Sequence, residues 1–557
     1  MLWAYFYYPG SLASVTQHFD TPTLPNFATQ TEPSTDVTSP KVAPTKPLQN
    51  RLREKQPKQP AESVKSAQAL VRQLMSEGRK KEASEVIFSL DLLSQLNTNT
   101  ATGRTRARAI MRDLEKTTAY YAAGNTASGK AQILGQYEGG HLAYVYYPNY
   151  GVHFNPVTTC NIALEKYAQG DNKQVVAIAD AILDNAIVKE YKGVGKYYIW
   201  EYYFDLEFNK YKFDAPWASG MAQGLILDVL GKTYTITDDK KYLRAAELVL
   251  NSFKVPYTEG GVTDIDNHGN WYLEVAATNK LRILNGYLFT LYSMHNFYEA
   301  TGNTKVLKLF NAGVGEAQYH LEQYDLGYWS NYSLLQGDRA SYGYHKIHVD
   351  LLKKLYAITK VPAFRTYADK FAFYQKYRFF DIPPTHRSFK AISVLTERGI
   401  VLGKDGWFGA GANTSRAELI TWIARGRGWA PLATYQGYYR DINKERADWG
   451  YIEAAYEHGL KMGNPDGYFR PNDPVNRADM ASILCKAFDV SSAKSIQPST
   501  PVSDIATGVR DKNSIVLALS SGLMEPYEPN YFRPTLGVTR EQAVNMLYKL
   551  FVPLAKQ

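Results

Sequence analysis

Cysteine is scarce in this sequence. The two cysteines among its 557 residues, Cys160 and Cys485, fall in different predicted domains. A disulfide framework of the kind that stabilises small secreted domains is therefore excluded. A low cysteine content fits the cytosol and the surface proteins of Gram-positive bacteria equally, so it does not assign a compartment by itself.

A long apolar run is also missing. The chain begins MLWAYFYYPGSLASVTQ, where the apolar stretch is short and no Lys or Arg precedes it. This start lacks the basic region of a signal peptide, and it is too short to span a membrane. We expect no membrane span.

Motifs for metals and nucleic acids are absent as well. The sequence has no zinc-finger spacing, RNP-like motif or long Arg-rich arm, which argues against nucleic acid as a partner. His345 and His348 lie three positions apart and can share one face of a helix, but no third ligand accompanies them. We therefore expect no metal and no cofactor.

The charge and the tyrosine content indicate the kind of partner instead. Lys and Arg total 63 against 54 Asp and Glu, which gives a net charge of +9. A basic balance favours anionic partners such as acidic glycans. The 43 tyrosines offer flat apolar faces with polar tips, which suit both sugar rings and helix packing.

The first part of the chain divides into a linker and a helical region. Residues 1–62 are rich in Pro, Thr, Gln and Lys from position 20 onward, so we expect a disordered N-terminal linker. Residues 63–139 form a helical lead-in, with one helix expected over 61–96 and a second over 104–121.

Residues 140–385 show a repeated pair of amphipathic helices joined by a tight polar turn. The four turns are QGDNK (169–173), TDDKK (237–241), TGNTK (301–305) and TKVPA (359–363). Hairpins of similar period bury their apolar faces by stacking around a shared core. The predicted fold class is therefore mainly α, an incomplete α/α toroid of about four helical hairpins. Three long loops between the helices (191–216, 254–279 and 324–344) are the expected location of a site.

A different repeat fills residues 386–555. ERGIVLGKDGWFGAGANTSRAEL is followed by EHGLKMGNPDGYFRPNDPVNRADM and, more loosely, by SSGLMEPYEPNYFRPTLGVTREQA. The three units cover about 386–437, 438–500 and 501–552, and each carries an Arg at the start of its second helix: Arg416, Arg477 and Arg540. Ser415, Asn476 and Thr539 stand just before these arginines and can cap the helices.

This triple repeat resembles the S-layer homology family. The resemblance implies an α-helical three-repeat bundle whose grooves bind pyruvylated secondary cell-wall polysaccharide, and therefore a protein at the cell surface. Arg416, Arg477, Arg540 and Trp407 are the expected wall-glycan-binding residues, since an Arg at a helix N-terminus can bind a pyruvate carboxylate. The alternative is that the arginines brace the bundle. The third unit departs from the family at Glu525-Pro526, where a glycine is expected. Since such repeats act outside the cell, we expect that part of a signal peptide is missing from this start.

The helical domain carries a second set of motifs. They are DAPWASGMAQGLILDVL (214–230), Trp271-Tyr272-Leu273-Glu274-Val275-Ala276 followed by Leu284-Asn285-Gly286, Tyr324-Asp325-Leu326-Gly327 followed by Tyr332-Ser333-Leu334, and Gly343-Tyr344-His345 followed by His348. Together they resemble the C-terminal domain of the D-glucuronyl C5-epimerase family over about residues 140–380.

The resemblance implies an isomerase that converts D-glucuronate to L-iduronate units in an acidic polymer such as heparosan, without a cofactor. Glu274, Tyr332 and Tyr344 would be catalytic, because epimerisation at C5 needs a proton-transfer group on each face of the ring. The residues that would bind substrate are Trp217, Gln223, Asn267, Tyr272, Asn285, Arg339 and His345. Glu274 and Tyr344 must then meet at one cleft.

Two departures from the family keep alternatives open. Val275 replaces a tyrosine of the family motif, and Leu335 replaces an arginine of vertebrate members. A uronate polysaccharide lyase begins with the same C5 proton abstraction and then expels the C4 oxygen. A non-catalytic, wall-anchored glycan-binding protein is the third interpretation, and Val275 favours it most.

Overall fold

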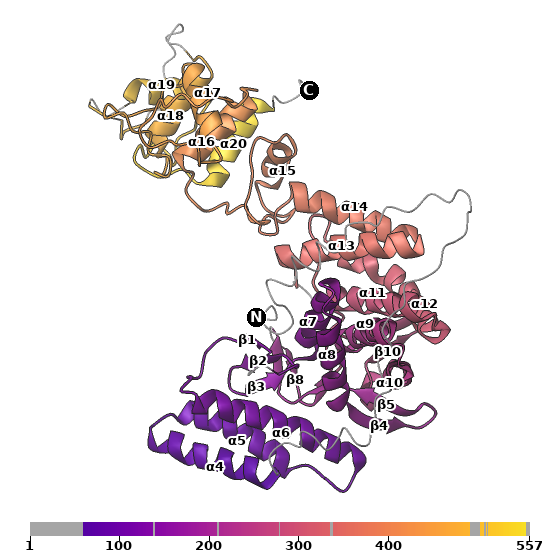
Figure 1. Ribbon diagram of the computed structural model, residues 1–557. Helices are drawn as coiled ribbons and strands as arrows, with labels where there is room; N and C mark the ends of the chain where they lie inside the picture. Colours follow the sequence, from indigo (N-terminus) through magenta and orange to yellow (C-terminus); the bar gives the residue numbers. More distant parts are fainter. Residues whose placement is uncertain are drawn as a thin grey trace, which may run out of the picture. The chain divides into compact units, whose positions relative to one another are not determined.

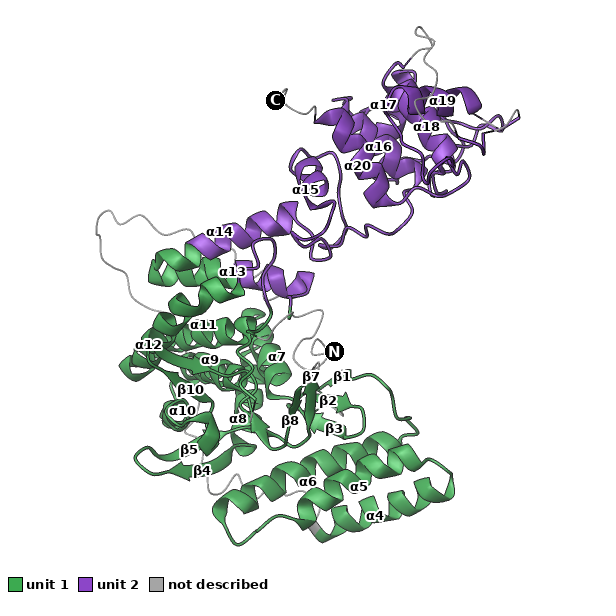
Figure 2. Cartoon of the chain, turned by 180° about the vertical axis from the view of Figure 1, so that it is seen from behind, with its two compact units in different colours: residues 1–324, 332–338, 351–365 green, residues 325–331, 339–350, 366–557 purple. Residues whose placement is uncertain are grey.

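The computed structural model describes residues 60–136, 140–208, 211–277, 279–334, 338–490, 502–505, 508–509 and 511–552. Most of the predicted linker, residues 1–59, and Leu335 lie outside the described residues. The chain divides into two compact units (Figure 2). Unit 1 comprises residues 1–324, 332–338 and 351–365, and unit 2 comprises 325–331, 339–350 and 366–557. The predicted domain boundaries stay predictions.

Three helices, not two, open the described chain (Figure 1): α4 (Pro60–Ser76), α5 (Lys80–Ser94) and α6 (Ala101–Ala122). The single helix predicted over 61–96 was wrong because Gly78 adopts a φ of 77° and ends α4. An antiparallel sheet follows, formed by β1 (Gln132–Gly135), β2 (Tyr144–Tyr147) and β3 (Gly151–Phe154). A partly buried ion pair between Arg106 and Glu201, 2.7 Å long, joins α6 to the helical domain.

The four predicted hairpins are present at the predicted turns. They are α7 (Pro156–Ala168) with α8 (Asn172–Asp184), α9 (Gly220–Thr237) with α10 (Lys240–Ser252), α11 (Leu284–Thr301) with α12 (Thr304–His320), and α13 (Tyr342–Thr359) with α14 (Pro362–Tyr377). The polar turn residues cap the second helix of three hairpins, since the side chains of Asp171, Asp239 and Asn303 accept backbone N–H groups of α8, α10 and α12.

The hairpins of unit 1 form an inner and an outer layer. Helix α9 contacts α7 on one side and α11 on the other. Every residue from Gly220 to Gly231 is buried, which is typical of a helix enclosed on all sides. Helices α8, α10 and α12 pack outside their partners. The predicted mainly α class of stacked helical hairpins is confirmed.

The long loops contain short strands, which the sequence did not predict. The antiparallel pairs are β4 (Ile187–Tyr191) with β5 (Gly195–Ile199), β6 (Glu201–Tyr202) with β9 (Trp217–Ala218), β7 (Leu206–Phe208) with β8 (Tyr211–Phe213), and β10 (Thr263–Asp266) with β11 (Gly269–Tyr272). Two 3-10 turns, η2 (Tyr257–Glu259) and η3 (Leu321–Tyr324), complete these connections. The site loops are therefore held by backbone pairing.

The C-terminal repeats of unit 2 each contribute two helices. These are α15 (Phe389–Glu397) and α16 (Arg416–Gly426), α17 (Trp449–Glu457) and α18 (Arg477–Ala487), and α19 (Lys512–Ser520) and α20 (Arg540–Phe551). A closed ring of backbone hydrogen bonds joins them: Thr414 donates to Val538, Val538 to Val475, and Val475 to Thr414, at 2.8–2.9 Å. One apolar core is shared by all three repeats, as predicted for a three-repeat bundle. Within the described part of the chain, no helix is long and apolar enough to cross a membrane.

Candidate functional site

The inner helices α9 and α11 begin on either side of the segment that carries Glu274. The N–H of Gly220, at the start of α9, donates to the carbonyl of Leu273 at 2.7 Å. The N–H of Ala276 donates to the carbonyl of Ala218 at 2.8 Å. Two backbone hydrogen bonds thus fix Glu274 at the ends of two helices whose free N–H groups favour negative charge.

Glu274 is a buried carboxyl group in direct contact with the first turn of α11. Its side chain is 1% exposed, and neither carboxylate oxygen has a hydrogen-bond partner among the described residues. A Cβ on Gly286 would lie 1.8 Å from Oε2 of Glu274, so the carboxylate rests on the backbone of that glycine. Burial raises the pKa of Glu274 to about 8. The N–H of Gly286 partly offsets the shift, although it falls short of a hydrogen bond.

Asn285 belongs to the first turn of α11, and Tyr332 is hydrogen-bonded to that turn. Asn285 is fully buried, and neither Nδ2 nor Oδ1 of its amide has a partner among the described residues. The carbonyl of Tyr332 accepts the N–H of Leu284 at 3.0 Å, and its side chain is 3% exposed. Three of the predicted site residues, Glu274, Asn285 and Tyr332, therefore belong to one local structure.

This turn combines the properties expected of a binding or catalytic site. Leaving a buried polar atom without a hydrogen bond costs about 1–3 kcal/mol, and such groups need an explanation in a folded protein. A carboxyl group whose pKa is about 8 can both accept and donate a proton near neutral pH. Perturbed carboxyl groups of this kind concentrate at functional sites.

Tyr202 is a further candidate that the sequence did not single out. Its ring stacks on Trp217 with centroids 4.0 Å apart and planes 7° apart. Its hydroxyl is buried without a hydrogen-bond partner among the described residues. Burial raises the pKa of Tyr202 well above its usual range, and the charge of Glu274 contributes. Only the aromatic richness of the loop over 191–216 pointed to this residue.

Three of the predicted substrate-binding residues donate hydrogen bonds inside the fold, although Oε1 of Gln223 is buried without a partner among the described residues. Nε1 of Trp217 donates to the carbonyl of Phe204 at 2.9 Å. Nε2 of Gln223 donates to Ser252 at 2.8 Å, and the hydroxyl of Tyr272 donates to the carbonyl of Leu309 at 2.7 Å.

Asn267 occupies a different kind of position from these three. It is exposed at the turn between β10 and β11. Substrate contacts from these four residues stay predictions.

The remaining predicted site residues lie in unit 2. Tyr344, in the first turn of α13, is 5% exposed. Glu274 belongs to unit 1, so the convergence of the two side chains stays a prediction. Nη1 of Arg339 donates to the hydroxyl of Tyr328 at 3.2 Å and also to the carbonyl of Phe380.

His345 is held as a neutral structural ring. It stacks on Trp329 at 3.9 Å, its Nε2 lies 2.8 Å from the carbonyl of Phe371, and its Nδ1 lies 2.6 Å from Oγ of Ser330. Burial lowers the pKa of His345 to about 4. Nδ1 of His348 contacts the same Ser330 oxygen at 2.9 Å. Since both nitrogens of His345 are engaged, the pair does not form a metal site as it stands.

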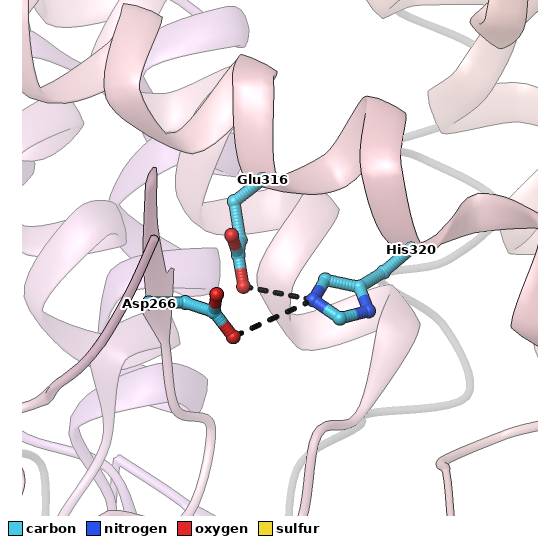
Figure 3. Close-up of side chains that lie close together, drawn as sticks. All are labelled: Asp266, Glu316 and His320. Carbon is cyan, nitrogen blue, oxygen red and sulfur yellow. Dashed lines mark ion pairs between the residues drawn. The ribbon is translucent and has the colours of Figure 1, made fainter. Parts of the chain in front are cut away.

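One cluster in unit 1 has the composition of a metal site. Asp266, Glu316 and His320 place one ligand atom each within 4.8 Å of one another (Figure 3). The guanidinium of Arg282 already lies among them, with Nη1 3.1 Å from Glu316 and 2.7 Å from Nε2 of His320. Its Nη2 lies 2.7 Å from Asp264. This side chain supplies the positive charge, so we interpret the cluster as an ionic network.

The arginines of the three repeats bridge each repeat to the next. Arg416, Arg477 and Arg540 are 9%, 3% and 8% exposed. Their Nε atoms donate to the carbonyls of Phe469, Phe532 and Phe408, at 2.9, 2.6 and 2.8 Å. Each acceptor belongs to the following repeat, and the acceptor of Arg540, in the third repeat, belongs to the first repeat. These contacts fit the alternative that the arginines brace the three-repeat bundle.

One equivalent position in each repeat carries an exposed aromatic residue. Trp407 is 52% exposed, and Tyr468 and Tyr531, at the same register of the other two repeats, are 41% and 42% exposed. A wall-glycan role for Trp407 and the three arginines stays a prediction.

Comparisons with known proteins match both parts of the chain. Residues 194–372 match the family model for the D-glucuronyl C5-epimerase C-terminus. The S-layer homology domain model matches residues 378–420, 438–481 and 511–544. Both resemblances predicted from the sequence are confirmed.

Three curated relatives illustrate these matches. The uncharacterized protein MJ1128 of Methanocaldococcus jannaschii is 34% identical over 154 residues, 27% of this chain and 49% of that protein. The D-glucuronyl C5-epimerase of Caenorhabditis elegans is 31% identical over 177 residues, 28% of this chain and 29% of that enzyme. The S-layer protein of Bacillus thuringiensis subsp. finitimus is 26% identical over 172 residues, 30% of this chain and 21% of that protein. The chain therefore spans about half or less of the length of these relatives. The repeats and the S-layer relatives confirm the predicted cell-surface location, with anchoring to the cell wall.

Proposed function

Because the chain joins a region that matches the D-glucuronyl C5-epimerase C-terminus to three S-layer homology repeats, we propose that it is a wall-anchored uronate C5-epimerase. Its substrate is a glucuronate-containing polysaccharide such as heparosan, and its product contains iduronate. The observation that carries the proposal is Glu274, a buried carboxyl group with no partner among the described residues and a pKa raised to about 8.

Glu274 acts as the proton-transfer group on one face of the uronate ring. In its ionised form it removes the hydrogen from C5 and becomes neutral, which its buried setting favours. The negative charge left on the substrate is delocalised into the uronate carboxylate. The first turn of α11, which Glu274 contacts at Gly286, and the amide of Asn285, which has no partner among the described residues, supply neutral hydrogen-bond donors for that charge.

Tyr344 acts on the opposite face. Its hydroxyl gives a proton to C5, which inverts the configuration, and the resulting phenolate and the neutral Glu274 then exchange protons with solvent. Tyr332, whose carbonyl accepts the N–H of Leu284 in the turn that Glu274 contacts, donates a hydrogen bond to the substrate. Val275 removes the phenol that family members carry next to the catalytic carboxyl group, so this site relies on fewer tyrosines.

The test is incorporation of deuterium from heavy water into C5 of heparosan and other glucuronate polymers. We expect exchange with the unchanged protein and none with Glu274→Gln, which matches the shape of the side chain but cannot transfer a proton. An increase in ultraviolet absorbance from an unsaturated uronate would instead identify a lyase. Binding without exchange on any polymer would leave only the glycan-binding interpretation.

The repeats hold the enzyme at its substrate. We propose that they bind pyruvylated secondary cell-wall polysaccharide, with Trp407 as an exposed platform for a sugar ring. Isolated cell walls with and without their ketal pyruvate test this partner. Equal retention of the full chain on both walls would refute it.

A further inference from the structure

A groove of unit 1 is lined by elements that do not carry Glu274. It has a volume of about 440 Å³ and lies between α6, α8, α10 and the β4–β5 hairpin. Its floor is apolar and consists of Leu183, Val188, Ala245 and Leu248, with the half-buried ring of Tyr198. This size falls in the range of roughly 300–1,000 Å³ found for ligand sites.

Two arginines face this groove from different helices. Arg108 comes from α6 and Arg244 from α10. Both side chains are exposed, and across the described residues neither has a hydrogen-bond or ion-pair partner. Guanidinium groups that are not engaged in the fold can bind carboxylates through two parallel hydrogen bonds.

The acidic residues of the groove do not cancel this positive charge. Asp180 is already paired, since it lies 2.8 Å from Nζ of Lys241 and accepts the hydroxyl of Tyr242 at 2.9 Å. Asp184 is the second carboxylate of the lining, which thus holds two carboxylates against three cations, Arg108, Lys241 and Arg244. Arg108 and Arg244 therefore leave a net positive groove.

A second hollow extends the groove along the same surface. It has a volume of about 340 Å³ and shares Arg244, with Lys240 and Leu243 of α10 and Thr301 of α11 on its walls. Its one carboxylate, Glu247, is bound by Lys305 at 2.8 Å. Two adjoining hollows that share a cation form a track, which fits an extended chain better than a compact small molecule.

We propose that this groove is a second binding site for an acidic polysaccharide, separate from the site at Glu274. Arg108 and Arg244 bind successive carboxylates, and the apolar face of a sugar ring lies on Tyr198 and Leu248. The identity of the polymer as a uronate rests on the proposed function, but the groove is independent of it, because Glu274 lines neither hollow. A chain held here raises the local concentration of polymer at the protein.

Binding is tested in the full chain that carries Glu274→Gln, so that turnover plays no part. We compare the affinity of this parent for heparosan with that of Arg108→Ala/Arg244→Ala, using isothermal titration at low and physiological salt. We expect the double variant to bind about tenfold more weakly. The matched control is Lys65→Ala/Lys173→Ala, which removes the same charge from exposed positions that line neither hollow. It should bind like the parent.

Several outcomes would overturn the proposal. The first two are an unchanged affinity of the arginine variant for heparosan and an equal loss of affinity in the lysine control. The other two concern the arginine variant with other polymers: an equal loss of affinity for neutral dextran, and a loss of affinity for duplex DNA without a loss for heparosan. Charge reversal by Arg244→Glu provides a second variant, and thermal unfolding checks that each variant is folded. If the unsubstituted protein shows no exchange at C5 while the arginine variant still has a lower affinity for heparosan, the catalytic proposal fails and the groove proposal stands.

Kinetics give a second readout if the enzyme is active. The arginine variant should show a raised KM for long heparosan and unchanged kinetics on a short oligosaccharide that fills only the Glu274 site. Equal effects on both substrates would contradict a separate site.

Discussion

Replacing Gly286 by alanine tests whether Glu274 is positioned by the first turn of α11. The new Cβ would lie 1.8 Å from Oε2, 2.5 Å from Cδ and 2.8 Å from Cβ of Glu274. Ordinary contact between such atoms is about 3.5 Å, so the carboxylate must move by roughly 1.5 Å. Because the glutamate meets the new methyl group along its length, rotation of its end alone does not relieve the contact.

The substitution separates activity from stability. A displacement of this size at a reacting group costs about 10²-fold in rate. The cost of overpacking is roughly 1–3 kcal/mol, and alanine returns up to about 1 kcal/mol through helix propensity. The protein should therefore remain folded while C5 exchange into heparosan falls by about two orders of magnitude.

The measurement pairs the exchange rate with thermal unfolding of the full chain. Gly315→Ala in α12 is the control, since its Cβ would meet only the carbonyl of His268, at 3.1 Å, and both properties should stay near those of the unchanged protein. Full exchange activity in a folded Gly286→Ala protein would refute the positioning of Glu274 that the mechanism requires.

Three further predictions concern stability. Since the folded pKa of Glu274 is raised from 4.5 to about 8, the unchanged protein loses stability as pH rises through this window. The free energy of unfolding of Glu274→Gln should therefore exceed that of its parent at pH 9 by up to a few kcal/mol, at about 1.4 kcal/mol per pKa unit, and match it near pH 4. Melting temperatures at the two pH values measure this difference. Asp228, whose pKa burial raises from 3.8 to about 6, should give a smaller gain of the same sign above pH 6 when changed to Asn, with exchange activity retained; melting curves at pH 4 and pH 8 check this. Arg477→Ala leaves the carbonyls of Phe532 and Glu525 without their donor, so denaturant titration should show a loss of about 2–4 kcal/mol, and an unchanged midpoint would contradict the brace.

The helical framework was predictable because its boundaries are local. Each hairpin turn carries a residue that caps the next helix, such as Asp171 or Asn303, and these interactions extend over only a few positions. The capping boxes at Ser415 and Thr539 work in the same way. Local chemistry of this kind can be identified from the sequence alone.

The environment of individual side chains was not predictable in the same way. Trp217 is a predicted substrate-binding residue, yet it is 1% exposed because β6 places Tyr202 directly against it. The arginines of the repeats look like ligand-binding groups, yet their partners lie one repeat away. Both outcomes depend on long-range packing, and the sequence predicted only the residue types involved.

The circular pattern of arginine contacts makes the wall-binding bundle an all-or-none unit. Since Arg416, Arg477 and Arg540 each reach into the following repeat, none of the three repeats is an end that can fray independently. Cleavage within any one of them opens the circle and leaves two neighbours with unmatched surfaces. A single proteolytic cut in one repeat is thus expected to lower the stability of all three repeats together rather than of that repeat alone.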